Sequence, residues 1–438
     1  MARDAEFRKI VSPKKLTGEI SIHGDKSISH RALILNSLAA GTAKVTNLSP
    51  AKDCLSTMRC LRALGVKVVW QPSVAPTVIV HGCGNSHFIE PNNVLNAGNS
   101  GTTIRLLSGV LAGQPFFSIL TGDSSLRSRP MGRIIQPLRL MGAEISGRGG
   151  DSYAPLAIKG KKLHGIEYHL SIPSAQVKSA ILLAGLLAQG ETIIEQSLPS
   201  RDHTERLLQR MGAEIVFDGR YIHLSPPTSP LNSIDIKVPG DISSAACWLV
   251  AGTIHPDARI RINSCGVNPF RTGIIDALRA MGARIRCENE RQEGNEPVAD
   301  LVVESSQLRG IELGGEIIPR LIDEIPLLAV AACVAEGVTV IREAAELRAK
   351  ESDRIANTVK ELSRLGAKID ELPDGMVIRG GTILHGAEVY SHRDHRLAMS
   401  LAVAGLVAKG STTIHNASIT DISYPGFWEV IQKISILD

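Results

Sequence analysis

LRALGVKV (61–68) is the first of five copies of one signature, and the others are LRLMGAEI (138–145), LQRMGAEI (208–215), LRAMGARI (278–285) and LSRLGAKI (362–369). In each copy a helix-like stretch ends at a glycine, and a strand-like alternation follows. Glycine suits the left-handed backbone conformation that ends many helices, because it carries no β-carbon. The five glycines lie 77, 70, 70 and 84 residues apart, a longer period than that of solenoid repeats. The pattern therefore predicts compact mixed α/β units.

A second signature, an alanine-rich stretch that runs into a glycine and then a strand, supplies a sixth copy of the unit. The glycines at these stops are Gly41, Gly113, Gly190, Gly252, Gly337 and Gly410. The last unit ends in FWEVIQKISI and lacks the glycine of the first signature. We expect an α/β (α+β) fold of two similar domains with three units each. With VPGD (238–241) as a hinge, the first domain covers 22–240 and the second covers 1–21 with 241–438, and the cleft between them holds the site.

The composition narrows the class of protein. A net charge of only +4, from 48 Lys and Arg against 44 Asp and Glu, argues against a uniformly basic nucleic-acid coat. The seven cysteines form no CxxC pattern, which favours reduced, structural thiols. The start, MARDAEFRKIVSPKK, has no apolar signal-peptide core, and no run approaches the ~18 apolar residues of a membrane span. We expect a soluble, cytoplasmic protein.

The residues before each alanine-rich stretch indicate a ligand. The six expected helix starts are GDKSISHR (24–31), GNSGTTIR (98–105), PSAQVKS (173–179), GDISSAA (240–246), IDEIP (322–326) and RDHRLAM (393–399). The unpaired N–H groups and positive dipole of a helix start attract anions, and Ser, Asp or Asn there are ordinary caps. A lysine, arginine or histidine at the same place opposes the dipole, so capping does not explain it. An anionic ligand that offsets both is the simplest explanation.

Six motifs carry a resemblance to a known family. They are GDKSISHRAL, LNAGNSGTTIRLL, GDSSLRSRPMGR, SAQVKSA, ELRAKESDRI and RDHRLAMS, in this order over nearly the whole chain. Together they resemble the 5-enolpyruvylshikimate-3-phosphate synthase family. PSAQVKS, SRDHTE, NPFRTG and IDEIPLLAVAA are similar to what is often called its second class. The resemblance implies the enolpyruvyl transferase fold, with two domains that each contain three βαβαββ units.

The resemblance also implies an activity. Enzymes of this family transfer the enolpyruvyl group of phosphoenolpyruvate (PEP) to the 5-hydroxyl of shikimate 3-phosphate by addition–elimination, and they release phosphate. The reaction belongs to the shikimate pathway of aromatic amino acid biosynthesis, uses no metal or organic cofactor, and is inhibited by glyphosate in the PEP site. We expect a monomer whose partners are these two substrates, without nucleic acid or membrane. Two anionic substrates also require converging cations, which the motifs supply.

The family pattern, carried over residue by residue, implies two overlapping sets of binding residues. The residues that the resemblance implies for binding shikimate 3-phosphate are Lys26, Ser27, Arg31, Ser174, Ala175, Gln176, Ser200, Arg201, Asp323 and Lys350. The residues implied for binding PEP are Lys26, Gly101, Arg129, Gln176, Arg354 and Arg396. The catalytic residues implied are Lys26, Asp323 and Glu351. Asp323 would accept the proton of the attacking hydroxyl, and Glu351 would exchange the proton at C3 of PEP.

Plainer roles remain open for both acids. Asp323 also fits a helix N-cap, and Glu351 also fits a helical partner of Arg354, three residues on. A carboxylate between Lys350 and Arg354 is expected to be a poor acid until PEP brings negative charge. The chain also departs from first-class members, with Ala175 for a serine, His203 for a tyrosine, Glu346 for an amide and Ile422 for a lysine.

Two other functions are compatible with the repeat. The sister enolpyruvyl transferase that acts on UDP-N-acetylglucosamine uses a Lys-Asn pair and typically a mobile-loop cysteine. Here Lys26 is followed by Ser27, and GDSSLRSRPMG has no cysteine. A non-catalytic anion- or RNA-end-binding protein would need no paired carboxylates, so Asp323 and Glu351 argue against it.

Overall fold

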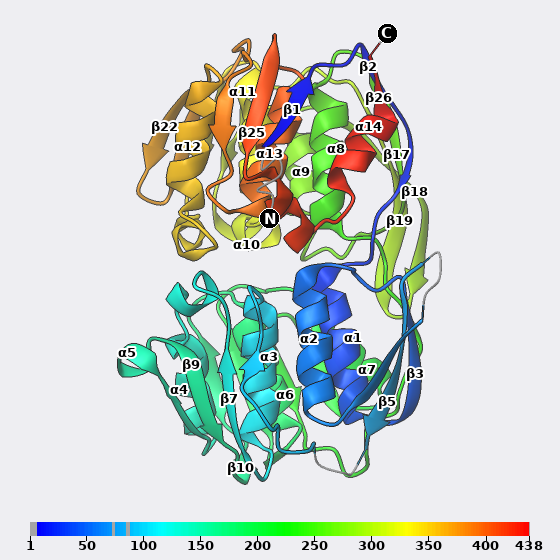
Figure 1. Ribbon diagram of the computed structural model, residues 1–438, viewed down its shortest axis with the longest axis vertical. Helices are drawn as coiled ribbons and strands as arrows, with labels where there is room; N and C mark the ends of the chain where they lie inside the picture. Colours follow the sequence, from blue (N-terminus) through cyan, green and yellow to red (C-terminus); the bar gives the residue numbers. More distant parts are fainter. Residues whose placement is uncertain (1–6, 72–74, 85–87, 438) are drawn as a thin grey trace, which may run out of the picture. The chain divides into compact units, whose positions relative to one another are not determined.

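The computed structural model describes residues 7–71, 75–84 and 88–437, so the first six residues of the charge-rich start lie outside the described residues. The chain forms two compact units, which Figure 1 shows coloured along the sequence. The inserted unit consists of His23–Val238 with Glu293–Glu296. The terminal unit consists of Met1–Ile22, Pro239–Gln292 and Pro297–Asp438. Each unit has a hydrophobic core of its own.

The described part of the inserted unit repeats one four-stranded sheet three times. Its sheets are β16(Ile236–Lys237)-β3(Ala40–Thr46)-β5(Thr77–Cys83)-β4(Lys67–Gln71), β6(Leu95–Asn96)-β7(Phe117–Thr121)-β9(Tyr153–Lys159)-β8(Glu144–Gly147) and β11(Glu167–Leu170)-β13(Thr192–Gln196)-β15(Tyr221–Leu224)-β14(Ile215–Phe217). In each sheet the first two strands are parallel and the other neighbours are antiparallel. Two short strands, β10(Leu163–His164) and β12(Ala188–Gln189), form a separate parallel pair. The edge strand β16 comes from the far end of the unit, so the first repeat closes only when the unit is complete.

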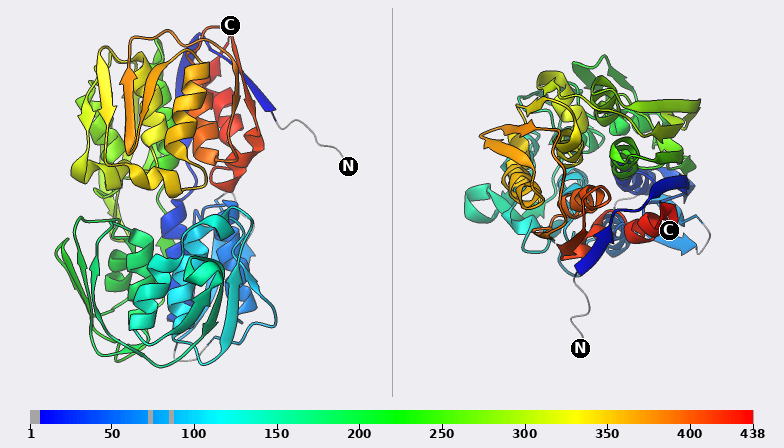
Figure 2. Two further views of the ribbon diagram at one scale, coloured as in Figure 1. Left: turned by 90° about the vertical axis from the view of Figure 1, so that its left-hand side faces the viewer. Right: turned by 90° about the horizontal axis from the view of Figure 1, so that it is seen from above.

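The described part of the terminal unit contains three sheets of the same kind that differ in their number of strands. Its sheets are β20(Glu312–Leu313)-β21(Val338–Ile341)-β23(Gly375–Arg379)-β22(Lys368–Leu372), β18(Arg284–Glu293)-β19(Glu296–Glu304)-β17(Ala258–Gly266)-β2(Lys15–Ser21)-β26(Ser435–Ile436) and β1(Phe7–Val11)-β25(Ser411–His415)-β24(Glu388–Tyr390). The N-terminal strand β1, dark blue in Figures 1 and 2, lies beside β25 and pairs with it antiparallel. It takes the place that a hairpin fills in the other repeats. The sixth repeat is therefore completed by the start of the chain.

Two kinds of helix cover the sheets. The apolar helices are α1(Lys26–Leu38), α3(Gly101–Ala112) and α6(Ala175–Gly185) in the inserted unit, and α8(Ile242–Ile254), α11(Ile325–Val334) and α13(His395–Gly405) in the terminal unit. The amphipathic helices are α2(Lys52–Ala63), α4(Gly132–Leu140), α7(His203–Arg210), α9(Gly273–Ala280), α12(Arg354–Arg364) and α14(Phe427–Ile434), and the short ones are α5(Arg148–Asp151) and α10(Ile318–Leu321). Every residue of α8 from Ile242 to Thr253 is buried. A helix that is apolar on all sides belongs in a core, which explains the alanine-rich stretches.

The glycines confirm most of the repeat signature. All five glycines of the first signature have positive φ, from 85° at Gly65 to 105° at Gly282. In the second signature Gly113 ends α3 as predicted, although its φ is −98°. The prediction is wrong at Gly252, which lies inside α8, because this helix continues to Ile254. A β-carbon on Gly252 would lie 2.7 Å from Val303, so this glycine lets α8 pack closely on β19.

The helix starts are capped largely as the sequence predicts. The side chains of Asp25, Ser100, Ser174, Asp241 and Asp394 each accept a hydrogen bond from a backbone N–H of the helix that follows. Helix α11 begins at Ile325 behind Glu324, and no side chain caps it. Among the described residues, no helix is both long and apolar enough to cross a membrane.

Candidate active site

Three buried helices of the inserted unit begin at residues that the sequence assigned to the site. Lys26, Gly101 and Ala175 are the first residues of α1, α3 and α6. The first N–H groups of a helix have no partner within it, so each start offers donors to an anion. Lys26 Nζ lies 2.9 Å from Asp53 Oδ2, a carboxylate on α2 that the motifs did not single out.

Arg31 is a buried guanidinium that contacts uncharged acceptors. Its Nε donates to Thr204 Oγ1 at 2.7 Å, its Nη2 to Ser179 Oγ at 2.7 Å and its Nη1 to the Ser27 carbonyl at 2.9 Å. Burial lowers the pKa of Arg31 to about 10, and the nearby charge of Arg201 adds to this against the opposite effect of Glu205. The hydrogen bonds therefore orient the guanidinium without neutralising its charge, as a site for a carboxylate requires.

Arg129 and Gln176 lie close to the start of α3. Arg129 follows the 3₁₀ turn Leu126–Ser128, is 7% exposed, and donates from Nη2 to Asn99 Oδ1 at 2.6 Å and to Ser125 Oγ at 3.1 Å. A β-carbon on Gly101 would lie 3.5 Å from Arg129 Nη1. Gly101 thus keeps the helix start open beside this guanidinium.

Arg105 is a residue that the motif reasoning missed. It stands in GNSGTTIR, one turn after Gly101, and donates to Gln176 Oε1 at 2.5 Å and to the Pro130 carbonyl at 3.2 Å. Gln176 Nε2 in turn donates to Thr102 Oγ1 at 3.0 Å. Arg105 therefore orients an amide that the sequence assigned to both substrates.

Ser27 follows Lys26 in α1, and the other assigned residues of this unit lie at the start of α6 and in the turn before α7. Ser174 caps α6, with its Oγ 3.4 Å from the Val177 N–H. Ser200 is buried and donates to Gln196 Oε1 at 3.3 Å. His203 is buried at the start of α7, with Nδ1 2.7 Å from Glu296 Oε1.

In the terminal unit, four assigned residues form one cluster around Arg354. Arg354 Nη1 lies 3.3 Å from Asp323 Oδ1, and its Nη2 lies 2.6 Å from Glu351 Oε2. Lys350 Nζ lies 3.5 Å from the same Asp323 oxygen. The fully buried Asp394 completes the cluster, because it accepts from Arg354 Nε at 2.8 Å. Burial opposes charge on Arg354, but Asp394, Glu351 and Asp323 outweigh it and raise the pKa of the guanidinium.

The structure corrects the plainer roles of the two acids. Asp323 is not the N-cap of α11, because the helix begins at Ile325 and Glu324 occupies the cap position. Glu351 does pair with Arg354, but not within a helix, because α12 begins at Arg354 behind its cap Asp353. Both carboxylates therefore lie in non-helical backbone next to a helix start.

Arg396 lies at the start of α13, where its backbone N–H donates to Asp394 Oδ1 at 2.9 Å, while its guanidinium contacts other residues. Its Nη1 donates to the Ser243 carbonyl at 3.4 Å and lies 3.8 Å from Glu324 Oε1. Glu324 is fully buried and also accepts from the hydroxyl of Ser243. Asp394 and Glu324 stand in the quoted helix starts, but only folding shows which cations they contact.

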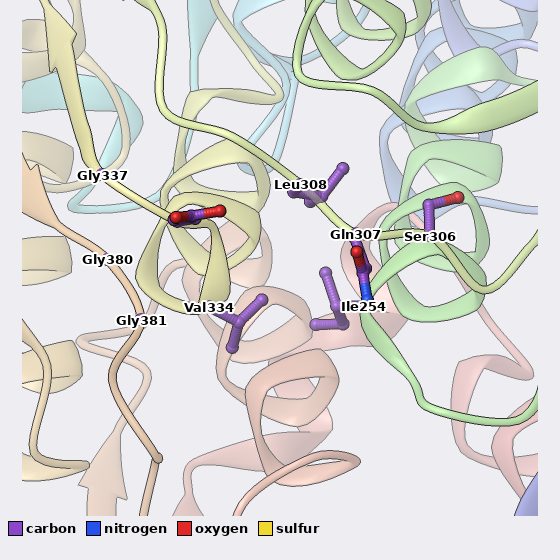
Figure 3. Close-up of a pocket in the computed structure, with 9 residues that line it drawn as sticks. Ile254, Ser306, Gln307, Leu308, Val334, Gly337, Gly380 and Gly381 are labelled. Carbon is purple, nitrogen blue, oxygen red and sulfur yellow. The ribbon is translucent and has the colours of Figure 1, made fainter.

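A cavity of about 580 Å³ in the terminal unit is not part of this arrangement. Figure 3 shows it near the C-terminal ends of α8 and α11, where it is lined by Ile254, Ser306, Gln307, Leu308, Val334, Glu336, Gly337, Gly380 and Gly381. None of these lining residues is one that the sequence assigned to the site.

The arrangement can bind anions at helix starts in one unit and move protons at carboxylates in the other. The chain has the fold of an enolpyruvyl transferase. The chain resembles the enolpyruvyl transferase NikO from Streptomyces tendae with a TM-score of 0.80, over 97% of this chain and 96% of that one, at 19% identity.

The chain belongs to the EPSP synthase (3-phosphoshikimate 1-carboxyvinyltransferase) family, whose model matches residues 10–431. It is 53% identical over 428 residues to the 3-phosphoshikimate 1-carboxyvinyltransferase of Roseiflexus castenholzii, covering 97% of this chain and 99% of the relative. It is 55% identical over 426 residues to that of Gloeobacter violaceus, covering 97% and 98%. A structure of EPSP synthase from Acinetobacter baumannii matches with a TM-score of 0.87 and 42% identity, covering 98% of each chain.

These findings confirm the fold, the family and the class of reaction predicted from the sequence. The chain is a transferase of the shikimate pathway, on the route to aromatic amino acids. Neither the UDP-N-acetylglucosamine enzyme nor a non-catalytic binding protein is favoured.

Proposed function

We propose that the residue sets of the two units act together on PEP and shikimate 3-phosphate. Each substrate carries a phosphate of about −1.5 to −2 and a carboxylate near neutral pH, so both need several cations. The observation that carries the proposal is Arg31, a buried guanidinium held by uncharged acceptors. Such a group gains most when an anionic ligand reaches it.

Shikimate 3-phosphate binds mainly to the inserted unit. Arg31 pairs with the ring carboxylate, while Ser174 and the Ser200–Arg201 turn hold the phosphate. Ser27, Ala175 and Gln176 line the ring. Since Ala175 offers no hydroxyl, Arg201 replaces the donor that a serine provides in first-class relatives.

PEP binds at the start of α3 and at the basic residues of the terminal unit. Arg129 and the N–H groups at Gly101 take its anionic oxygens, with Gln176 beside them. Lys26, Arg354 and Arg396 supply further positive charge. Lys350, by contrast, is assigned to shikimate 3-phosphate, and its contact with Asp323 places its charge beside the carboxylate that takes the proton of the hydroxyl.

Asp323 is the base and Glu351 the acid of the addition step. Asp323 takes the proton of the 5-hydroxyl, the oxygen forms a bond to C2 of PEP, and Glu351 delivers a proton to C3. In the elimination step C3 returns a proton to Glu351, the C2–O bond to phosphate breaks, and the leaving phosphate takes up the proton that Asp323 holds, so that the enol ether remains and both carboxyl groups regain their starting states. PEP competes with Glu351 for Arg354, so its arrival favours the protonated carboxyl that the first step needs.

Binding of both substrates requires the two units to act on one ligand pair, so we expect the protein to become more compact with shikimate 3-phosphate. Small-angle scattering measures this, and an unchanged radius at saturating ligand would contradict it. We also expect a cytoplasmic monomer, which cell fractionation and light scattering can check.

The direct test is phosphate release. The purified protein should release phosphate from PEP only when shikimate 3-phosphate is present, and not with UDP-N-acetylglucosamine in its place. Release with the nucleotide sugar, or no release with shikimate 3-phosphate, would overturn the proposed function.

A further inference from the structure

Lys178 is a buried cation to which neither the motifs nor the proposed function assigns a task. It lies in the N-terminal part of α6, two residues after Gln176, and its side chain is 0% exposed. Burial of an ammonium group is costly unless protein acceptors replace its water shell. The position therefore needs an explanation.

The ammonium group of Lys178 has three acceptors for its three N–H bonds. Its Nζ lies 2.6 Å from Glu205 Oε1, 3.1 Å from the Ser200 carbonyl and 3.4 Å from Gln196 Oε1. Glu205 is itself 1% exposed. The pair is thus closed to solvent on both sides.

These acceptors come from the segments that hold shikimate 3-phosphate in the proposed function. Ser200 belongs to the turn proposed to bind the phosphate, and its hydroxyl donates to the same Gln196 oxygen that Lys178 contacts. Glu205 follows Thr204, whose hydroxyl accepts from Arg31 at 2.7 Å. Through one side chain, α6 is therefore fixed to the turn and to α7.

Stability alone does not account for the pair. Well-packed apolar side chains often replace a buried ion pair without loss of stability. Moreover, the second oxygen of Glu205, Oε2, is buried without a hydrogen-bond partner among the described residues. A pair that is only partly satisfied is a poor way to strengthen a core, but it does fix the relative position of three segments.

We infer that Lys178 and Glu205 are positioning residues that set the phosphate subsite of shikimate 3-phosphate. The inference rests on the proposed function. Through these contacts the ion pair fixes the Ser200–Arg201 turn and α7 relative to α6, whose first residues are proposed to hold the same phosphate. Because the two charges cancel, the pair fixes the relative positions of these segments and adds no net attraction for the phosphate.

The test is the double variant Lys178→Met/Glu205→Met, which removes both charges and leaves neither one buried alone. With PEP as the second substrate, kcat and KM are measured for shikimate 3-phosphate and for shikimate, which lacks the phosphate. We expect the preference for the phosphorylated substrate to fall about tenfold or more, as misplaced binding groups cost rate on this scale. The KM for PEP should change less than about threefold, and the melting temperature should stay close to that of the parent. Leu182→Met, on the same buried helix, is the matched control and should leave all values unchanged.

Two results would overturn the inference. One is a folded double variant that keeps the parent's preference for shikimate 3-phosphate, and the other is an equal loss for both substrates. If the double variant does not fold, Glu205→Gln, which keeps the shape and removes one charge, must lower the same preference. A parent protein inactive with shikimate 3-phosphate would refute the proposed function instead, whatever the variants do.

Discussion

Arg31 and Arg354 are both buried guanidinium groups, at 3% and 2% exposure, near the start of a helix in the same kind of repeat. Their surroundings differ. Arg31 donates to two hydroxyls and a carbonyl, and burial lowers its pKa, whereas Arg354 contacts three carboxylates, which raise its pKa against the effect of burial. The repeat thus supplies one cation, Arg31, whose hydrogen-bond acceptors are uncharged, and one, Arg354, whose charge is already balanced by carboxylates. In the proposed function, the first cation binds an anionic substrate, and the second contacts the two carboxylates that transfer protons.

Removal of the acids should have the largest effect on turnover. We expect Asp323→Asn and Glu351→Gln each to lower kcat about 100-fold or more, the usual scale for loss of a general acid or base. Steady-state assays check this. Asp370→Asn, an exposed carboxylate paired with Arg379 in the same unit, is the control and should keep full activity.

The two arginines should differ in their effect on stability. Arg354→Met leaves the fully buried Asp394 without its guanidinium partner, which typically costs about 3–5 kcal/mol, or at least about 6 °C in melting temperature. Arg31→Met leaves the hydroxyls of Ser179 and Thr204, which already lie 2.7 Å apart and can bond each other, so little loss is expected. Calorimetry compares the variants. Equal losses would show that the two guanidinium groups do not differ as described.

Arg129→Ala should raise the KM for PEP about 10-fold to 100-fold, because it removes a charge-assisted contact made in the ground state. The value of kcat at saturating PEP should change less. Arg127→Ala, two residues away and exposed, serves as the control. A larger fall in kcat than rise in KM would move Arg129 from binding to the chemical step.

Gly101→Ala should weaken the binding of glyphosate more than the binding of PEP. The new methyl would lie 2.8 Å from Arg105 Nη1, so the guanidinium that holds Gln176 must move. Crowding of this kind costs on the order of 1–3 kcal/mol, which is enough for a tenfold loss of affinity for glyphosate, the more extended of the two ligands. Inhibition assays at varied PEP measure both constants. Equal constants for parent and variant would show that the methyl does not discriminate.

Local patterns made much of the fold predictable. The glycine that ends five of the six amphipathic helices and the polar cap that begins five of the six buried ones act within a few residues, so the sequence shows them directly. The strand β1 that completes the sixth sheet pairs Phe7 with His415, and no local pattern announces such a partner.

The site was predictable in its residue types but not in its contacts. Arg105, Lys178 and Asp394 all stand in quoted motifs, yet their tasks depend on partners from 27 to 71 positions away, namely Gln176, Glu205 and Arg354. Gly252 shows the converse, since a glycine that reads as a helix stop is required by close packing on β19. Sequence patterns name the candidates, and tertiary contacts decide which of them bind, react or position.

The most direct test of the division between the units is calorimetric titration of shikimate 3-phosphate into three proteins. The parent and Asp323→Asn should bind with dissociation constants within about threefold of each other, because the amide keeps the shape of the acid and loses only its basicity. Arg31→Met should bind about 10-fold to 100-fold more weakly, as expected for loss of a charge-assisted pair. Abolished binding in Asp323→Asn together with unchanged binding in Arg31→Met would show that the terminal unit, and not Arg31 of the inserted unit, binds shikimate 3-phosphate.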